Sequence, residues 1–294
     1  MTTDNLPLSP TRRKGTGTRF VDRLGKFLAF VVLVIISALI IFPALWMLST
    51  ALKPDVQVYA NPPIWIPSPI KWENFIHAWT LAPFTRYTIN TTLYTAAVIV
   101  GTLLSCSLAA YGFAKLRFPG RNLLFTILLS TMMIPGMVTM IPQYILFSKL
   151  GWVGTYLPLI VPSYFAGAFF TFLLRQFYLG IPNELSEAAR VDGASDLWIW
   201  WKVMVPLSKP ALATVAIFTF EGTWDSYVGP LLYLNSDKLY TLQVGLQFFR
   251  TASEVQWQYL MAASILVMLP VIIIFFAFQK YFVEGAAIGS GVKG

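Results

Sequence analysis

Long uninterrupted runs of apolar residues dominate the pattern along this chain. Each run meets or exceeds the roughly 20 apolar residues that a helix needs to cross the hydrocarbon layer of a bilayer. Backbone groups must be satisfied internally in lipid, and these runs are too long for barrel strands, so we predict an all-α membrane protein with six transmembrane helices. The six runs lie near 27–49, 87–114, 122–148, 156–179, 208–234 and 257–282.

The segments outside these runs predict three parts of the chain. They are a cytoplasmic N-terminal tail (1–26), a six-helix transmembrane domain (27–282) and a cytoplasmic C-terminal tail (283–294). The first run lacks a small-residue cleavage site, so we interpret it as a retained helix and not as a signal peptide. Prolines predict kinks or unwound turns inside the third and fourth runs. They are Pro135, Pro142, Pro158 and Pro162.

Basic residues flank the apolar runs unequally. Of the 21 Lys and Arg residues, fifteen fall in the N-terminal tail, the 115–121 link, the 175–209 region and the C-terminal end, and six fall on the opposite side. The positive-inside rule therefore predicts that both termini are cytoplasmic, in a multi-pass protein of the bacterial inner membrane. Because the charge follows the membrane topology, and no basic stretch is interleaved with aromatic residues, we expect no nucleic-acid partner.

Composition excludes several kinds of chemistry. Only 12% of the residues are charged, against about a quarter in soluble domains. The chain has one cysteine, Cys106, which we expect to be a small packed residue. It has one histidine and no metal-ligand spacing, so we expect no metal site. The sequence has no GxxxxGK[ST] phosphate loop and no nucleophile elbow, so we expect a chain that binds no cofactor and is not itself catalytic.

The 180–207 segment, GIPNELSEAARVDGASDLWIWWKVMVPL, predicts a helix–turn–helix that we call the hook. Asn183 is a good N-cap, Gly193 is suited to end the first helix, and Ser195 is suited to begin the second. The second helix is strongly aromatic on one side. A compact hook exposed to the cytoplasm is suited to docking a partner, and the alternative is an amphipathic helix that lies on lipid.

Several fragments resemble one known family. Within the hook, Glu187-Ala188-Ala189, Asp192-Gly193-Ala194 and Val205-Pro206-Leu207 look like the EAA loop of bacterial ABC importer permeases, with the spacing of the carbohydrate-uptake branch. The resemblance covers nearly the whole chain and points to the smaller permease subunit of maltose and oligosaccharide importers; alginate-type importers also fit the overall pattern. The further fragments are Asn61-Pro62-Pro63, Ala110 to Ala114, Pro182 to Pro210, Tyr240-Thr241-Leu242 and Gly291 to Gly294.

The resemblance implies a coupling role for the hook. Residues 182–204 would dock on a separate ATPase, and Trp200, where many relatives have Phe, would enlarge the contact. The importer implied by the resemblance moves a sugar or oligosaccharide by alternating access. Its other parts would be two ATPase subunits that bind Mg-ATP, a homologous six-helix permease and an external solute-binding protein. The implied docking residues are Glu187, Ala188, Ala189, Asp192, Gly193 and Trp200.

Two further places have candidate functional residues. Glu221 and Asp225 lie four residues apart in the fifth run, so they share a helix face. With Trp224 between them, we expect them to line the translocation path or to pair with a neighbouring subunit; the alternative is that they touch water near the outer end. The resemblance implies that the 235–256 loop reaches the external binding protein. Its candidate contacts are Tyr240, Phe248, Phe249 and Arg250.

Three other functions stay open from the sequence. An ion-coupled secondary transporter would use Glu221 and Asp225, but it predicts inverted repeats, and no clear repeat is present. A membrane enzyme would gather polar catalytic groups at one interface, and none cluster there. A permease of the same superfamily for a non-sugar solute is the nearest alternative.

Overall fold

The computed structural model describes residues 16–250 and 255–289, and its regular elements there are all helical apart from an isolated bridge between Arg250 and Val255. The α-helices are α1 (Thr16–Ala51), α2 (Asp55–Val58), α3 (Glu73–Leu81), α4 (Phe84–Lys115), α5 (Arg121–Ser130), α6 (Gly136–Lys149), α7 (Leu157–Ile160), α8 (Ala168–Leu179), α9 (Glu184–Val191), α10 (Asp196–Ile199), α11 (Val205–Leu207), α12 (Lys209–Trp224), α13 (Val228–Tyr233), α14 (Leu242–Gly245) and α15 (Trp257–Gly289). Shorter turns are the 3-10 helices η1 (Thr131–Met133), η2 (Val161–Tyr164), η4 (Asp237–Leu239) and η5 (Leu246–Phe249), and the π-helix η3 (Trp200–Met204).

Four helical stretches are long and apolar enough to cross a membrane. Two further pairs pass the same test but are bent, by 100° between the α5–η1 stretch and α6 and by 82° between residues 196–207 and α12. If each bent pair counts as one span, the total is six. The all-helical class is confirmed, and the count of six stays a prediction. The four stretches are Gly25–Ala51, Phe84–Lys115, Leu157–Leu179 and Trp257–Lys280.

The element boundaries differ from the expected segments in three places. The helix α1 begins at Thr16, so the basic end of the expected N-terminal tail is helical, while residues 1–15 lie outside the described residues. The expected run 208–234 is divided, because α12 ends at Trp224 and Asp225 forms its C-cap. At the other end, α15 continues to Gly289 and enters the expected C-terminal tail, whose last five residues are not described.

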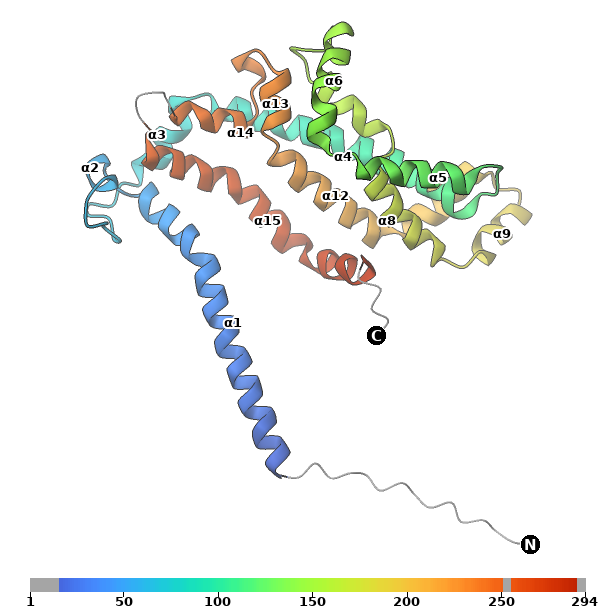
Figure 1. The fold of residues 1–294 in the computed structure, drawn as a ribbon, viewed down its shortest axis with the longest axis horizontal. Coiled ribbons are helices and arrows are strands. Elements are labelled where there is room, and N and C mark those ends of the chain that lie inside the picture. Colours follow the sequence, from blue (N-terminus) through green and yellow to red (C-terminus); the bar gives the residue numbers. More distant parts are fainter. Residues whose placement is uncertain (1–15, 251–254, 290–294) are drawn as a thin grey trace.

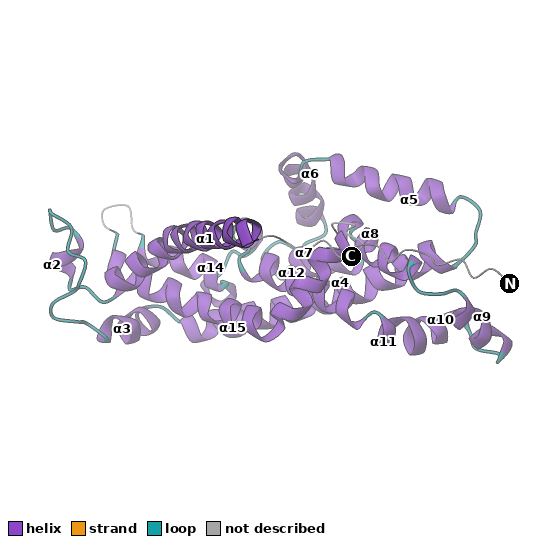
Figure 2. Cartoon of the chain, turned by 90° about the horizontal axis from the view of Figure 1, so that it is seen from below, coloured by secondary structure: helices purple, strands orange, loops and turns teal. Residues whose placement is uncertain are grey.

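Helix α4 runs through the middle of the bundle (Figure 1) and packs against both α8 and α12. Helix α15 lies on the other side of α12 and also contacts α3. Helix α1 contacts α15 near one end and then diverges from the other helices (Figure 1). Figure 2 shows α5 standing off the bundle, with α9 to α11 at one end of the molecule and α2 and α3 at the other.

The buried apolar side chains form two clusters. The first, which we call the loop core, joins the end of α1 to α3, α14 and the start of α15. The second, the hook core, joins the hook to the ends of α4 and α8 and the start of α12. Cys106 is buried in the hook core as a free thiol, as expected for a small packed residue. The hook core comprises Cys106, Ala110, Tyr111, Ala114, Leu174, Tyr178, Ile199, Trp200, Met204, Ala211 and Val215.

Candidate functional site

The hook is the helix–turn–helix that the sequence predicts. Its first helix, α9, ends before Gly193, whose φ of 83° lies in the left-handed region that glycine adopts without strain. The amide of Ala194 donates to the carbonyl of Ala189 at 2.9 Å and closes the turn. The hydroxyl of Ser195 then accepts from the amide of Trp198 at 3.3 Å, which caps α10 as expected.

Asn183 occupies the N-cap position of α9, as expected, but its side chain does not cap the helix. Asn183 has helical backbone angles. Its Oδ1 instead accepts a hydrogen bond from Nζ of Lys115 at 2.8 Å. The long-range charge-assisted bond takes the oxygen that a local cap would use, since charged donors make the stronger hydrogen bonds.

The expected docking residues divide into two groups. Glu187, Ala188, Asp192 and Gly193 are exposed around α9 and the turn, and Ala189 is half-buried. Trp200 is only 8% exposed and lies in the hook core against the ends of α4 and α8. Trp200 therefore stabilises the hook by packing it against the bundle, and it contributes little to the exposed surface of the hook.

Other aromatic and apolar residues of the hook lie at its surface. Leu197, Trp198 and Trp201 are 61%, 49% and 52% exposed. A π-helical turn at η3 follows α10, and such turns change the direction of the side chains that follow them. The family pattern predicted Trp200 as a docking residue and did not point to Trp198 or Trp201. The closeness of the three tryptophans in the sequence was the one sign that Trp198 and Trp201 could also contribute to the surface.

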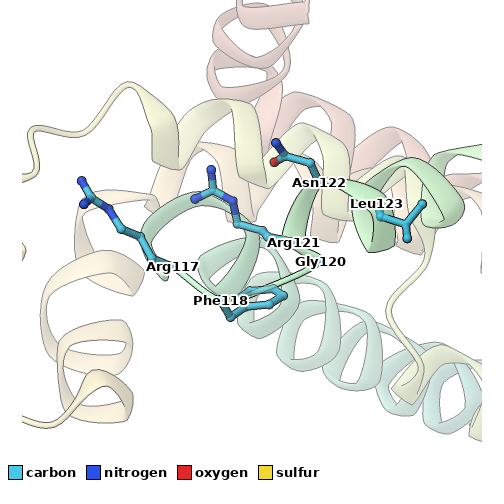
Figure 3. A pocket seen from close by; sticks show the side chains of 6 residues that line it. All are labelled: Arg117, Phe118, Gly120, Arg121, Asn122 and Leu123. Atoms are coloured by element: carbon cyan, nitrogen blue, oxygen red, sulfur yellow. The ribbon is translucent and has the colours of Figure 1, made fainter.

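A basic link connects α4 to α5 beside the hook. Between this link and the hook lies a cavity of about 720 Å³, lined by Lys115 and Arg190 among others, with Glu187 and Asp196 as its acids. An adjoining cavity of about 350 Å³ is lined by Arg117 and Arg121, and Figure 3 shows both guanidinium groups on the same side of the link. The concentration of basic residues here agrees with the flanking charge noted in the sequence.

The two acids expected to line the translocation path, Glu221 and Asp225, are both exposed to the surroundings of the subunit. Glu221 lines an otherwise apolar cavity of about 340 Å³ between α12 and α15. One oxygen of Asp225 accepts from the amide side chain of Gln243 at 3.1 Å. Trp224 differs, since it is 4% exposed and its indole N–H donates to the carbonyl of Val267 at 3.0 Å. Trp224 thus packs α12 against α15.

The expected loop contacts also divide. Phe248 is 52% exposed and Arg250 is exposed, whereas Tyr240 is half-buried beside Tyr87. Phe249 is 1% exposed and stacks on Phe84 at 5.7 Å between ring centroids, so it anchors the loop in the loop core. Residues 251–254 of this loop lie outside the described residues.

Metal-ligating side chains do not gather in the part of the chain that the structure describes. Over the ranges 16–250 and 255–289, no three His, Cys, Asp or Glu residues lie where they could hold an ion.

The hook thus lies at one end of a helical bundle whose long apolar helices are suited to cross a membrane. The sequence matches the family described as "Binding-protein-dependent transport system inner membrane component" over residues 101–287. This chain belongs to that family. The match confirms the family expected from the hook residues, and it argues against an ion-coupled secondary transporter.

Three permease proteins align with this chain over most of its length and most of their own. The arabinooligosaccharides transport system permease protein AraQ of Halalkalibacterium halodurans is 34% identical, over 88% of this chain and 93% of that protein. The sn-glycerol-3-phosphate transport system permease protein UgpE of Yersinia enterocolitica is 35% identical, over 87% and 93%. The probable ABC transporter permease protein YurM of Bacillus subtilis is 33% identical, over 92% and 90%.

Solved structures agree with this assignment. One chain in a crystal structure of a bacterial ABC transporter involved in the import of the acidic polysaccharide alginate aligns with a TM-score of 0.80 and 26% identity, over 94% of this chain and 100% of that chain. A second, from an alginate ABC transporter in complex with an alginate pentasaccharide-bound periplasmic protein, aligns with a TM-score of 0.63 and 15% identity, so it shows the fold alone. The chain is a permease subunit of an ABC importer.

Proposed function

We propose that this chain is one of two membrane-spanning subunits of an ABC importer for a sugar or oligosaccharide. The observation that carries the proposal is the combination of full-length similarity to an arabinooligosaccharide permease with the exposed hook at one end of the bundle. Permease subunits of this family do not hydrolyse ATP, so hydrolysis of Mg-ATP takes place on partner ATPases.

The hook is the surface on which we expect an ATPase to dock. Its first helix exposes Glu187 and Ala188. The small alanine allows close backbone approach, and Glu187 offers a charge to a basic partner. Gly193 keeps the turn tight enough for both helices to enter one cleft. With the hook in the cytoplasm, six spans place both termini there too, in the inner membrane.

A homologous sister subunit is supported by α1. This helix has a long apolar stretch, and no residue in its most apolar window is buried within the chain. A second permease would give α1 a protein neighbour and would close a path along the exposed acids of α12. At the opposite end of the bundle, exposed Phe248 and Arg250 are suited to contact an external binding protein.

The test begins with tagged complex purified in mild detergent and reconstituted with lipid. We expect to recover a sister permease and an ATPase, with ATP hydrolysis stimulated by a sugar-loaded binding protein. Glu187→Lys reverses the charge on the hook and should reduce the recovered ATPase about tenfold. The control is Glu73→Lys, which reverses the charge of another exposed acid, on α3 at the other end of the bundle. It breaks the exposed 3.7 Å ion pair with Lys71 and should leave recovery unchanged.

A chain that purifies alone and transports without ATP would overturn the proposal. A non-sugar solute is the second candidate for the substrate. The chain is 35% identical to UgpE, a permease of an sn-glycerol-3-phosphate transport system. Uptake assays with neutral oligosaccharides and with a glycerol phosphate separate these two candidates, since only one should stimulate hydrolysis.

A further inference from the structure

Asp196 lies where three elements of the inner end of the bundle meet. Its Oδ1 accepts from Nη2 and Nε of Arg190, at 2.8 and 3.1 Å, which ties α10 to α9. The same oxygen accepts from the phenol of Tyr111 at 3.2 Å, which ties both helices to α4. The hydrogen bond to Asp196 raises the pKa of Arg190 above its ordinary value, so the guanidinium stays charged.

Helix α4 holds the hook at a second point, one turn further on. The ammonium of Lys115 donates to the carbonyl of Ile181 at 2.6 Å and to Oδ1 of Asn183 at 2.8 Å. These two acceptors immediately precede α9. Tyr111 and Lys115 lie four residues apart on α4, so one face of α4 contacts both the segment that precedes α9 and the first residue of α10.

Apolar packing attaches the two hook helices to the bundle very differently. Six of the eight residues of α9 are exposed, Ser186 is buried, and Ala189 is half-buried. The following stretch buries Ile199, Trp200 and Met204 in the hook core. A displacement of α9 therefore reaches the bundle mainly through the polar contacts at Asp196 and Lys115.

We propose that Asp196 and Tyr111 are positioning residues that transmit movement of α9 to α4. The proposal rests on the proposed docking of an ATPase on the hook. Because α4 packs against α8 and α12, a pull on its inner end acts on the centre of the bundle. Without the Asp196 contacts, α9 would move with the ATPase while α4 lags behind, so ATP would be hydrolysed with less solute transported.

The measurement is the number of ATP molecules hydrolysed per solute molecule transported, with the complete complex in proteoliposomes. Asp196→Ala should raise this ratio about three- to tenfold, because hydrogen bonds to charged groups are the strong ones. Tyr111→Phe removes one hydroxyl but keeps the buried ring, and should raise the ratio about twofold. Asp196→Glu, which retains the carboxylate, should recover most of the coupling.

The double variant Tyr111→Phe with Asp196→Ala separates a shared contact from general damage. If the contact transmits the movement, Tyr111→Phe has no further effect once Asp196 is absent, since interaction energies appear as non-additivity. Arg117→Ala is the matched control. Arg117 is an exposed cation that lines, with Asp196, the cavity of about 720 Å³ between the basic link and the hook, but it is not one of the hydrogen-bond partners of Asp196. It should keep the wild-type ratio.

Two results would overturn the proposal: a wild-type ratio for Asp196→Ala, or effects of the two substitutions that simply multiply. If Asp196→Ala prevents assembly, Tyr111→Phe still decides, because an unchanged ratio in that variant counts against the contact. Failure of the proposed function looks different, since then the wild-type complex itself yields no ATPase and no ATP-dependent transport.

Discussion

Helices α1 and α4 are both long and apolar, yet they are packed in opposite ways. No residue in the most apolar window of α1 is buried within the chain, whereas 39% of the residues in the corresponding window of α4 are buried. The window in α1 is the more apolar of the two. Greater hydrophobicity therefore goes with less contact to the rest of the protein.

The two faces of α4 explain this difference. Small and polar residues lie on its buried face, where they allow close approach of neighbouring helices, and large apolar residues lie on its exposed face. The buried set includes Thr91, Thr95, Gly101, Thr102 and Ser107. The exposed set, at spacings of mostly four residues, is Ile89, Leu93, Val100, Leu104 and Leu108. The packing face of α4 thus combines small and polar residues with aromatic rings, whereas its exposed face carries large aliphatic residues. The buried rings are those of Phe84, Tyr87, Tyr94 and Tyr111.

The largest expected effect on stability comes from filling the packing face of α4. A Cβ at Gly101 would lie 2.7 Å from the ring of Tyr164 and would force η2 away. Gly101→Ala should therefore destabilise the folded subunit by about 1–3 kcal/mol. Heating in the presence of a maleimide dye measures this loss, because Cys106 is the single thiol and is buried.

Gly112→Ala on the same helix is the matched control. A Cβ there meets no atom within 4 Å. The substitution should be neutral or stabilise the helix by about 0.5–1 kcal/mol, since alanine is favoured over glycine in helices. Equal losses for the two variants would contradict the close packing of α4 against η2.

The next effect comes from a polar contact on the same face. The hydroxyl of Thr91 accepts from the amide of Leu242 at 2.9 Å and donates to the carbonyl of Tyr87 at 2.8 Å. Thr91→Val keeps the shape but leaves a buried amide unpaired, so it should cost about 1–2 kcal/mol in the same dye assay. Thr92→Val, at the exposed neighbouring position, should stay within about 0.5 kcal/mol of the wild type.

The smallest effect on the isolated subunit is expected in α1. Leu39 and Ile40 are 68% and 72% exposed, so replacing both by Ala removes no packing within the chain. The free energy of unfolding of the isolated subunit should change by less than about 0.5 kcal/mol. If a sister permease covers α1, the yield of assembled complex should nevertheless fall. Destabilisation of the isolated subunit would show instead that α1 packs on its own chain.

The sequence predicted the hook closely because its signals are local. Gly193 and Ser195 act on backbone groups within a few residues, and the structure confirms both. Asn183 failed as a cap because its partner is Lys115, 68 residues away in the chain. Trp200 was assigned to the surface from a family pattern, while packing against α4 and α8 buries it and leaves Trp198 and Trp201 exposed.

The membrane spans show the same division. Length and composition identified the apolar runs, and Pro135 marked the place where α5–η1 and α6 diverge. The angle of 100° between them could not be read from a proline, because neighbouring helices set how far the freed backbone turns. Likewise, the spacing of Glu221 and Asp225 predicted a shared face. Only the tertiary structure shows that Glu221 lines a cavity between α12 and α15, whereas Asp225 accepts a hydrogen bond from Gln243.

The sequence by itself determined the all-helical membrane class, the apolar runs, the family and the local turns of the hook. These features depend on hydropathy, on residue spacing and on backbone preferences that act within a few residues. Only the tertiary structure decided which face of each helix is packed, which hook tryptophan is buried, and that one face of α4 contacts both the segment before α9 and the start of α10. The physical reason is that lipid and protein interior are both apolar, so the hydrophobic pattern separates membrane from water but does not separate the inside of the bundle from its outside.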